Sequence, residues 1–310
     1  MNRRRGKLTV DMTPDELRSR LGRVGIWMPP PERIGVDPVS TAAAIERAGF
    51  TSVWVGGGNP DKAAFARLRA QLAGSERLVV ATGIVNVWPW EPAALRTEAE
   101  ALAADFPGRF ILGVGVSHAP LVETLGHAYQ RPLRKMEKFL DELDHPAYHG
   151  GDQELPPIVI AALGPKMLEL ARDQALGSHP YFTTPEHTRF AREVLGPAPL
   201  LVPELACTLA DDPAAGAATA RTYANRYLQL PNYTKNLERF GFGPADFQGT
   251  GSDRLISQVI PNGPAPLRER LSSHLDAGAD HVVIQPLDAD GFTAASLASL
   301  ATAVAEFVTG

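Results

Sequence analysis

His118 is the residue of this 310-residue chain that is best placed for proton chemistry. It follows the apolar run Phe110–Val116 almost directly, with Ser117 before it and Ala119-Pro120 turning the chain away. An imidazole at the end of a buried strand can exchange a proton near neutral pH. The alternative is a structural histidine held by hydrogen bonds. We take His118 as the candidate catalytic residue.

A second motif, Gly164-Pro165-Lys166, suits an anion. Proline fits the first turn of a helix, and the small glycine lets an anion approach the free N–H groups there. A plain turn from strand to helix would look the same. Because the motif follows an apolar run that we read as a strand, we favour a phosphate site.

Dinucleotide binding finds less support. Gly113-Val114-Gly115 resembles the start of the G-x-G-x-x-G fingerprint, but His118 stands where the third glycine belongs. The motif also lies inside an expected strand and not at a strand-to-helix turn.

Metal and glycosidase chemistry are also disfavoured. There is no HExxH, and Pro146 argues against a helix that would face His145 and His149 together. We therefore expect no metal. Glycosidases need two opposed carboxylates, and Glu204 and Glu123 are the nearest candidates without an obvious partner.

Composition excludes several further classes. The chain carries 30 lysines and arginines against 35 acidic residues, a net charge of −5 without a basic stripe, so nucleic acid is not an expected partner. Cys207 is the single cysteine, which favours a reducing, cytoplasmic compartment. No apolar run reaches the roughly 18 residues of a membrane span, and Arg3–Arg5 lead into no signal sequence. We expect a cytoplasmic protein that binds a small-molecule substrate, without membrane contact, and a homodimer is possible.

Short Val/Ile/Leu-rich runs alternate with stretches of helical period, as in parallel sheets buried on both faces. The expected strands are Val24–Met28, Ser52–Gly56, Leu78–Val85, Phe110–Val116, Ile158–Ala162, His179–Thr183, Leu200–Thr208 and His281–Pro286. Eight such strands predict an α/β fold, a (β/α)8 barrel in one domain spanning 1–310, with insertions after strand 4 (Ser117 to Pro157) and strand 7 (Asp211 to Pro264). A doubly wound open sheet is the alternative. Glycines at Gly49, Gly177 and Gly278 are expected to end helices.

A barrel keeps its chemistry at the carboxyl ends of its strands. Few of the residues expected there are charged, and glycines and aromatic residues are frequent. They are Trp27, Gly56-Gly57-Gly58-Asn59, Asn86, Trp88, Ser117, His118, Gly164-Pro165-Lys166 and Thr183-Thr184. This composition suits a flat, largely uncharged ring system better than a sugar or a metal.

Several segments, in order and spacing, resemble one known family. They are Gly22–Trp27, Glu46–Phe50 before Val53–Val55, Ala81–Val85, Pro107–Phe110 before Leu112–Gly115, Ala161–Met167, Ser178–His187 and Ala277–Ile284. Together they resemble the bacterial luciferase-like flavin and deazaflavin oxidoreductases, and within them the actinobacterial group that depends on coenzyme F-420.

The resemblance implies a luciferase-like barrel with the deazaflavin lying across the strand ends. It implies a non-proline cis peptide bond at Gly83-Ile84, behind the central ring, and phosphate contacts at Leu163-Gly164 and Thr183. Residues implied to bind the cofactor are Gly57, Gly58, Gly83, Ile84, Asn86, Ser117, Leu163, Gly164 and Thr183.

The chain departs from its relatives at two strand ends. Many relatives end strand 2 with Ser-Asp-His, where this chain has Gly56, Gly57 and Gly58. Relatives that oxidise a sugar phosphate have a glutamate at the position of His118, so that substrate class is not expected. The acidic F-420 tail needs local positive charge. Arg131, Arg134, Lys135 and Lys138 could supply it, or could form a solvated helix face.

Three functions follow from these residues. The first is an F-420-dependent oxidoreductase in which hydride passes between the deazaflavin C5 and an organic substrate, with His118 exchanging the accompanying proton. The second is an FMN-dependent luciferase-like monooxygenase. The third is a barrel that binds the deazaflavin without turnover, which the glycines at positions 56–58 would favour.

Overall fold

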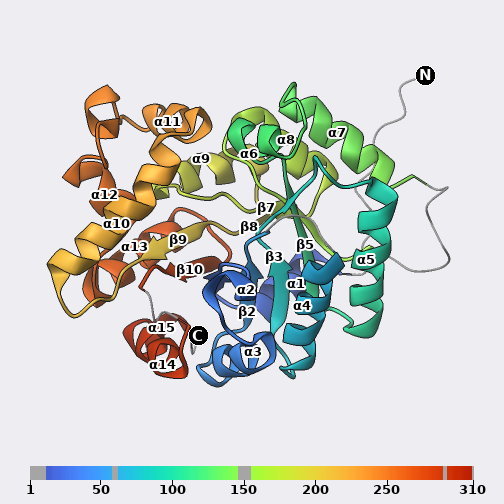
Figure 1. The fold of residues 1–310 in the computed structure, drawn as a ribbon, viewed down its shortest axis with the longest axis horizontal. Coiled ribbons are helices and arrows are strands. Elements are labelled where there is room, and N and C mark those ends of the chain that lie inside the picture. The colour runs from blue at the N-terminus through green and yellow to red at the C-terminus, as the bar shows by residue number, and fades with distance from the viewer. Residues whose placement is uncertain (1–11, 58–61, 146–154, 289–291, 309–310) are drawn as a thin grey trace.

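The structure is a computed structural model that describes residues 12–57, 62–145, 155–288 and 292–308 (Figure 1). The strands are β1 (Val24–Met28), β2 (Ser52–Val55), β3 (Val79–Thr82), β4 (Val85–Asn86), β5 (Phe110–Gly115), β6 (Ile158–Ile160), β7 (Gly177–Ser178), β8 (Leu200–Leu201), β9 (Glu204–Cys207) and β10 (Val282–Pro286). The helices before β6 are α1 (Pro14–Leu21), α2 (Pro31–Ile34), α3 (Pro38–Arg47), α4 (Lys62–Ala73), α5 (Pro92–Asp105), α6 (Ala119–Thr124) and α7 (Pro132–Leu143). Those after it are α8 (Pro165–Gln174), α9 (Pro185–Leu195), α10 (Pro213–Leu228), α11 (Pro231–Glu238), the 3-10 turn η2 (Pro244–Phe247), α12 (Asp253–Val259), α13 (Pro264–Asp276), α14 (Ala294–Ala303) and α15 (Ala305–Val308).

Every strand pairing is parallel within the described residues, in the order β8-β7-β6-β5-β3-β2-β1-β10-β9, with β4 beside β5. Only Val202 and Pro203 separate β8 from β9, so one interrupted strand joins the two ends of this order. The amide of Glu204 donates to the Pro180 carbonyl (2.9 Å), and the amide of Val283 donates to the Pro203 carbonyl (3.1 Å). The sheet is thereby closed, and the predicted (β/α)8 barrel is confirmed.

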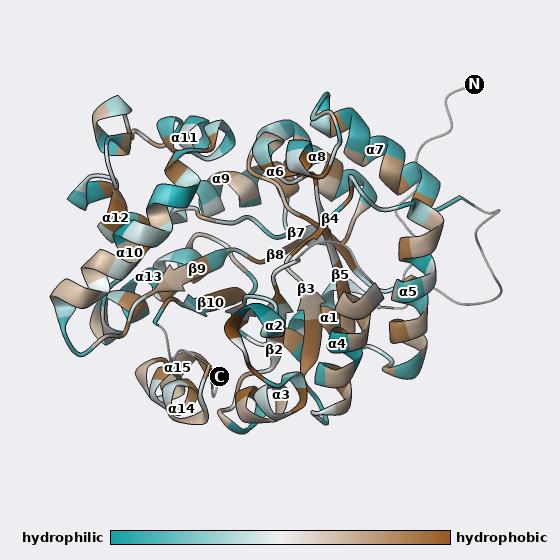
Figure 2. Cartoon of the chain, in the orientation of Figure 1, coloured by the Kyte–Doolittle hydropathy of each residue, from teal (hydrophilic) through white to brown (hydrophobic). Residues whose placement is uncertain are grey.

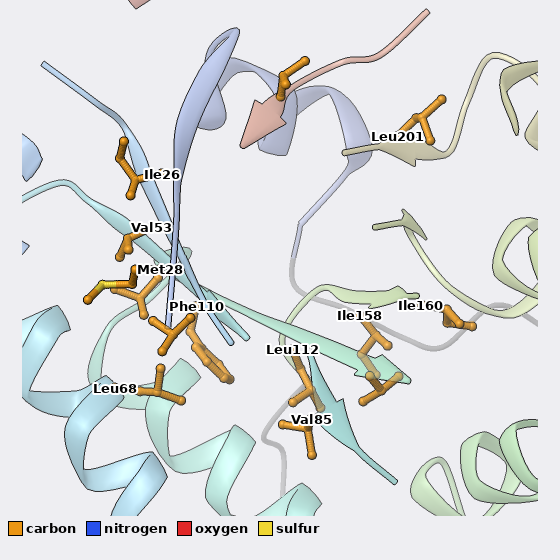
Figure 3. Close-up of a cluster of buried hydrophobic side chains, with 14 of the residues drawn as sticks. Ile26, Met28, Val53, Leu68, Val85, Phe110, Leu112, Ile158, Ile160 and Leu201 are labelled. Atoms are coloured by element: carbon orange, nitrogen blue, oxygen red, sulfur yellow. The ribbon is translucent and has the colours of Figure 1, made fainter. Parts of the chain in front are cut away.

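Apolar side chains pack on both faces of the barrel sheet, because successive residues of a strand point to opposite faces. Trp27, Trp54, Ala81, Ile111 and Val159 pack together in one cluster. Their neighbours along the same strands pack against the surrounding helices, and Figure 3 shows Leu68 of α4 beside Met28 and Phe110. The colouring in Figure 2 accordingly concentrates hydrophobic residues at the central strands. Burial on both faces explains why the strands read as continuous apolar runs.

Most expected strands are confirmed to within a few residues, but one is misplaced. The sequence predicts a strand at His179–Thr183, whereas β7 is Gly177–Ser178. Gly177 therefore begins a strand and does not end a helix; a Cβ there would overlap with the Leu200 carbonyl of the neighbouring strand. Gly49 (φ 95°) and Gly278 (φ 99°) do adopt the left-handed conformation that follows a helix.

The long connection between β9 and β10 builds a helical layer over one side of the barrel, where Figure 1 shows α10, α11 and α12 gathered together. These helices pack around Phe182 and Ala206, which belong to the strand-end region of the barrel. The layer brings Tyr223, Tyr227 and Tyr233 to that end of the molecule. Among the described helices, none is long and apolar enough to cross a membrane.

Buried histidines make the fold sensitive to acid. Burial lowers the pKa of His179, His187 and His281 to about 4, and that of His274 to about 3, from the ordinary 6.5. Below pH 6.5 the unfolded chain therefore binds protons that the folded chain refuses, and stability falls by up to about 1.4 kcal/mol per pH unit for each histidine. Glu204 opposes this trend, since its raised pKa adds stability as the pH falls toward 4.5.

Denaturant titrations at neutral pH and near pH 5 should show a lower free energy of unfolding at the acid value. Equal stabilities would contradict these assignments.

Candidate active site

Gly83 and Ile84, which separate β3 from β4, form the centre of the site. Their peptide bond is cis, as the family resemblance predicts. The indole Nε1 of Trp27 donates to the Gly83 carbonyl (3.1 Å), which ties the end of β1 to this turn. Gly57, after β2, lies so close that a Cβ there would overlap with the Ile84 carbonyl. Gly58, the next predicted cofactor residue, lies outside the described residues.

The glycines of β5 are explained by the Ile84 side chain. A Cβ at Gly115 would lie 2.6 Å from Ile84 Cδ1, and one at Gly113 would overlap with the Thr82 carbonyl. Because Gly113 and Gly115 have no side chains, the Thr82 backbone and the half-buried Ile84 side chain can approach β5 closely. These glycines serve this close packing and do not form a phosphate-binding loop. The sequence argument against a dinucleotide fingerprint agrees with this geometry.

Several polar side-chain atoms near the strand ends are buried without a hydrogen-bond partner in the structure. They are Asn86 Nδ2, His118 Nδ1, Thr183 Oγ1 and His179 Nε2. Asn86, His118 and Thr183 are residues that the sequence analysis singled out. Because a buried polar group without a partner costs about 1–3 kcal/mol, such a group calls for a ligand or water to satisfy it.

His118 sits half-buried at the N-terminal end of α6, and no side-chain hydrogen bond of its own caps that helix. Its ring contacts the Tyr233 ring of α11 (5.3 Å between centroids), and its side chain bonds to Asn232. Burial lowers its pKa below the ordinary 6.5, and the bond to Asn232 offsets this in part. At neutral pH His118 is therefore an uncharged imidazole that can accept a proton.

Ser117, the residue before it, adopts φ 56°, which is uncommon for a residue with a side chain. Its carbonyl accepts a hydrogen bond from the Tyr129 hydroxyl (3.2 Å). The left-handed backbone turns the chain sharply between β5 and α6, so that Ser117 and His118 both remain at the strand end.

The Leu163-Gly164 turn sits between β6 and α8, as the phosphate prediction requires. Gly164 is the N-cap residue of α8, and no side chain caps the free N–H groups there. The guanidinium of Arg239 lies 3.5 Å from the position that a Gly164 Cβ would take. The Leu163 carbonyl contacts His187 Nε2 (3.0 Å), which fixes the turn against α9. A guanidinium facing uncapped amides makes a cradle for an anion.

Thr183 does not end a strand as predicted. It follows β7 by several residues and precedes Thr184, the N-cap residue of α9. Thr183 is 1% exposed, and its hydroxyl has no hydrogen-bond partner in the structure.

The predicted basic cluster is divided by the structure. Arg131 caps α7 with φ 47°, and Lys138 pairs with Glu142 (3.3 Å) on the solvent side of that helix. Lys135 lies over the Trp88 ring, 5.5 Å from its centroid, and burial lowers its pKa. Of this cluster, Lys135 is the residue that contacts a strand-end side chain within the part of the chain that the structure describes. Within the described ranges, no group of three or more His, Cys, Asp or Glu residues is arranged to hold a metal.

Sequence reasoning missed two groups of residues. The first group is His179 and Arg239. His179 follows β7, its Nδ1 contacts the Val202 carbonyl (2.7 Å), and its Nε2 would lie 3.2 Å from a Cβ at Gly83. Arg239 is exposed on the helical layer, with no motif around it. The other group is a set of buried hydroxyls around Glu204, contributed by Tyr181, Tyr223 and Tyr227. The only signal for it was the carboxylate at position 204.

Comparisons with known proteins agree with this geometry. The 5,10-methylenetetrahydromethanopterin reductase of Methanolobus tindarius is 25% identical over 299 residues, covering 81% of this chain and 92% of the reductase. An F-420-dependent secondary alcohol dehydrogenase, solved with an F-420-acetone adduct, superposes with a TM-score of 0.68 at 16% identity, over 91% of this chain and 99% of the other. The FMN-bound oxygenating constituent of the 3,6-diketocamphane monooxygenase of Pseudomonas putida gives 0.67 at 13% identity, over 92% and 98%.

The family comparison covers most of the barrel. Residues 37–245 match the luciferase-like monooxygenase family, a range that includes the Gly83-Ile84 turn, His118 and the Leu163-Gly164 turn. Members of this family are oxidoreductases or monooxygenases that use a flavin or deazaflavin cofactor. The chain belongs to the luciferase-like monooxygenase family.

Proposed function

We propose that the protein is a coenzyme F-420-dependent oxidoreductase that transfers a hydride between the deazaflavin C5 and an organic substrate. The observation that carries the proposal is the set of unpartnered polar atoms of Asn86, His118 and Thr183 around strand ends lined with glycine. The edge of a flat ring system would satisfy Asn86, its phosphate would satisfy Thr183, and the substrate would satisfy His118. The reductase that resembles the chain favours hydride transfer over oxygenation.

The residues of the strand ends fit the cofactor. Gly57, Gly83 and Ile84 would lie behind its ring, with Asn86 and Ser117 at its edge. Leu163, Gly164 and Thr183 would hold the phosphate, with Arg239 opposite. When bound, the deazaflavin supplies the hydride acceptor or donor, and the barrel supplies position and exclusion of water.

His118 has the protonation state that substrate oxidation requires. An imidazole that is uncharged at neutral pH accepts the proton that leaves the substrate oxygen or nitrogen as its hydride departs. The Tyr233 ring packs against the His118 ring, and Asn232 forms a hydrogen bond with the His118 side chain. These contacts hold the imidazole in place, while its Nδ1 has no partner.

Two alternatives are separated from this function by the cofactor bound and by turnover. An FMN-dependent monooxygenase is supported by the structural similarity to the camphane monooxygenase component, and it would bind FMN in preference to F-420. A barrel that binds deazaflavin without turnover would bind F-420 tightly, and His118 variants would have no rate to lose.

The proposed function is tested by following the absorbance of F-420 during incubation with alcohols and reduced pterins or imines as hydride donors. Reduction of F-420 by one donor class supports it, and binding without reduction by any class favours the third function.

Arg239→Ala is expected to weaken F-420 binding by roughly 10- to 100-fold, because a charge-assisted contact to phosphate contributes about 1.5–3 kcal/mol. Binding of a phosphate-free deazaflavin should be unchanged in the same variant. Fluorescence titration at low and high salt measures both, and the loss should shrink as salt rises. Arg189→Ala, an exposed arginine on α9, is the matched control. Equal loss for both deazaflavins would contradict a phosphate role.

A further inference from the structure

Helix α11 contacts the candidate site at both of its ends. At its beginning, Asn232 bonds to the His118 side chain, and the Tyr233 ring packs against the His118 ring (5.3 Å between centroids). At its other end, Arg239 is the C-cap residue with helical dihedral angles (φ −62°, ψ −24°), and its guanidinium lies 3.5 Å from the position that a Gly164 Cβ would take. The step from Asn232 to Arg239 corresponds to about 10 Å of helix. One face of α11 therefore extends from the imidazole to the anion cradle.

Asn236 lies on this same face, four residues after Asn232 and three before Arg239. It is 2% exposed, and neither its Oδ1 nor its Nδ2 has a hydrogen-bond partner within the described residues. Leaving both ends of a buried amide unpaired costs stability. Packing of the helix therefore gives no reason for an asparagine at this position.

The two other buried residues of α11, Tyr233 and Leu237, do serve the fold. They belong to the apolar cluster around Phe182, and Leu163 packs against the same cluster. The Phe182 and Tyr233 rings meet edge to face, 5.7 Å apart between centroids. These contacts hold α11 against the strand-end region, and they hold the Asn236 amide in place between the two ends of the site.

The chemistry of the unpaired amide indicates the kind of ligand that would match it. Asn236 Nδ2 is a donor and its Oδ1 is an acceptor, so a partner must both accept and donate. A phosphate or carboxylate would satisfy only the donor, and an ammonium group only the acceptor. Two hydroxyl groups on neighbouring carbons match both atoms at once, since one accepts from Nδ2 while the other donates to Oδ1.

Resting on the proposed function, we propose that Asn236 binds the hydroxylated chain that joins the deazaflavin ring to its phosphate. The proposed function puts the ring against the Gly83-Ile84 turn, within reach of a substrate at His118, and the phosphate opposite Arg239. The chain then runs along α11 from the Arg239 end toward the His118 end. Asn236 is about 4.5 Å along the helix axis from Arg239, which is the next turn that the chain passes.

Three probes that share one ring separate this role from that of Arg239. They are F-420, the phosphate-free deazaflavin that keeps the hydroxylated chain, and a ring-only deazaflavin with a methyl group in place of the chain. Asn236→Leu should weaken binding of the first two by roughly tenfold and leave the third unchanged, because only contacts to the chain are lost. Arg239→Ala should weaken binding of F-420 alone. Asn236→Ala, which removes the amide without adding bulk, should repeat the pattern of Asn236→Leu in fluorescence titrations.

The second measurement is the denaturant midpoint of the protein without cofactor. Leucine has the branched shape of asparagine and no polar atoms, so Asn236→Leu should raise the midpoint by removing the unpaired amide. Asn225→Leu on α10 is the matched control, because Asn225 is half-buried and its Oδ1 already accepts from Gln229 (3.4 Å). The midpoint of this control should not rise. Saturating F-420 should stabilise the wild type more than Asn236→Leu, in line with its tighter binding.

Unchanged F-420 affinity in both Asn236 variants overturns the proposal, and so does an equal loss for the ring-only probe. A lower midpoint of Asn236→Leu without cofactor would show that the amide supports the fold, which also overturns it. Hydroxyl groups of the substrate present the same chemistry. If they were the partner, the KM for the substrate would rise at unchanged F-420 affinity, and the assignment to the cofactor chain would fall.

Failure of the proposed function has a different signature. If the wild type prefers FMN, the F-420 assignment fails, but Asn236→Leu should still weaken FMN, which carries the same kind of chain, and spare lumiflavin, which carries a methyl group instead. A wild type that binds none of these flavins and deazaflavins overturns the proposed function and the role of Asn236 together.

Discussion

Replacing His118 with alanine or glutamine is expected to lower the rate of substrate oxidation by about 10²–10⁴-fold, the usual contribution of a general base. The imidazole is half-buried, its Nδ1 has no partner, and burial keeps it uncharged at neutral pH. Without the imidazole, the proton that departs from the substrate has no acceptor. F-420 binding should be largely retained, because the glycines behind the ring and the phosphate cradle are untouched. Steady-state turnover and fluorescence titration of the same variants measure the two quantities.

The pH dependence of the wild type gives an independent check on His118. Since its pKa lies below 6.5, the base form predominates at neutral pH, and the rate should fall as the pH drops below that ordinary value and through the pKa of His118. His127→Gln, a variant in the same connection between β5 and β6, should keep both the rate and the acid limb of the profile. Undiminished turnover in both His118 variants would show that the imidazole does not carry the proton.

Gly57→Ala is expected to lower turnover with F-420 on the order of 10²-fold and to weaken cofactor binding. The new Cβ would overlap with the Ile84 carbonyl, which is backbone and cannot swing aside as a flexible side chain would. The turn that backs the ring must therefore shift, and a displacement of about 1 Å at a reacting centre is enough to lower the reaction rate about 10²-fold. Overpacking of this kind also destabilises a fold by about 1–3 kcal/mol.

Gly243→Ala is the matched control for this prediction. Gly243 lies in the helical layer with φ −121°, and nothing lies within 4 Å of the position that its Cβ would take. This variant should bind F-420 as the wild type does and unfold at the same denaturant concentration. If Gly57→Ala behaves like Gly243→Ala, the strand-2 glycine does not support the turn.

The barrel could be predicted because its signal is repeated along the chain. Strands buried on both faces leave continuous apolar runs, and β1 was predicted at its observed bounds of Val24–Met28. The strand predicted at His179–Thr183 was wrong. Aromatic and threonine residues favour strands by type, but in the structure this segment leaves the sheet and packs against the helical layer. Tertiary packing of Phe182 against α10 decides the local structure at that point.

The site could be predicted only where a residue follows a strand within a few positions. His118, Gly83 and Gly164 are of this kind, and their roles in cofactor binding and catalysis stay predictions. Arg239, Tyr223 and Tyr227 are not, since they reach the strand ends from helices whose packing no local pattern encodes. Glu204 was visible as a carboxylate, but its protonation depends on burial among Tyr181, Tyr223 and Tyr227, which only the folded arrangement provides.

The central claim is tested most directly by titrating the purified protein with F-420 and, separately, with FMN while following tryptophan fluorescence. Trp27 bonds to the turn behind the proposed ring position, so a ligand there should quench its emission. We expect micromolar binding of F-420 and much weaker binding of FMN. Preference for FMN would contradict the F-420 assignment and favour the monooxygenase, and binding of neither would contradict the proposed function altogether.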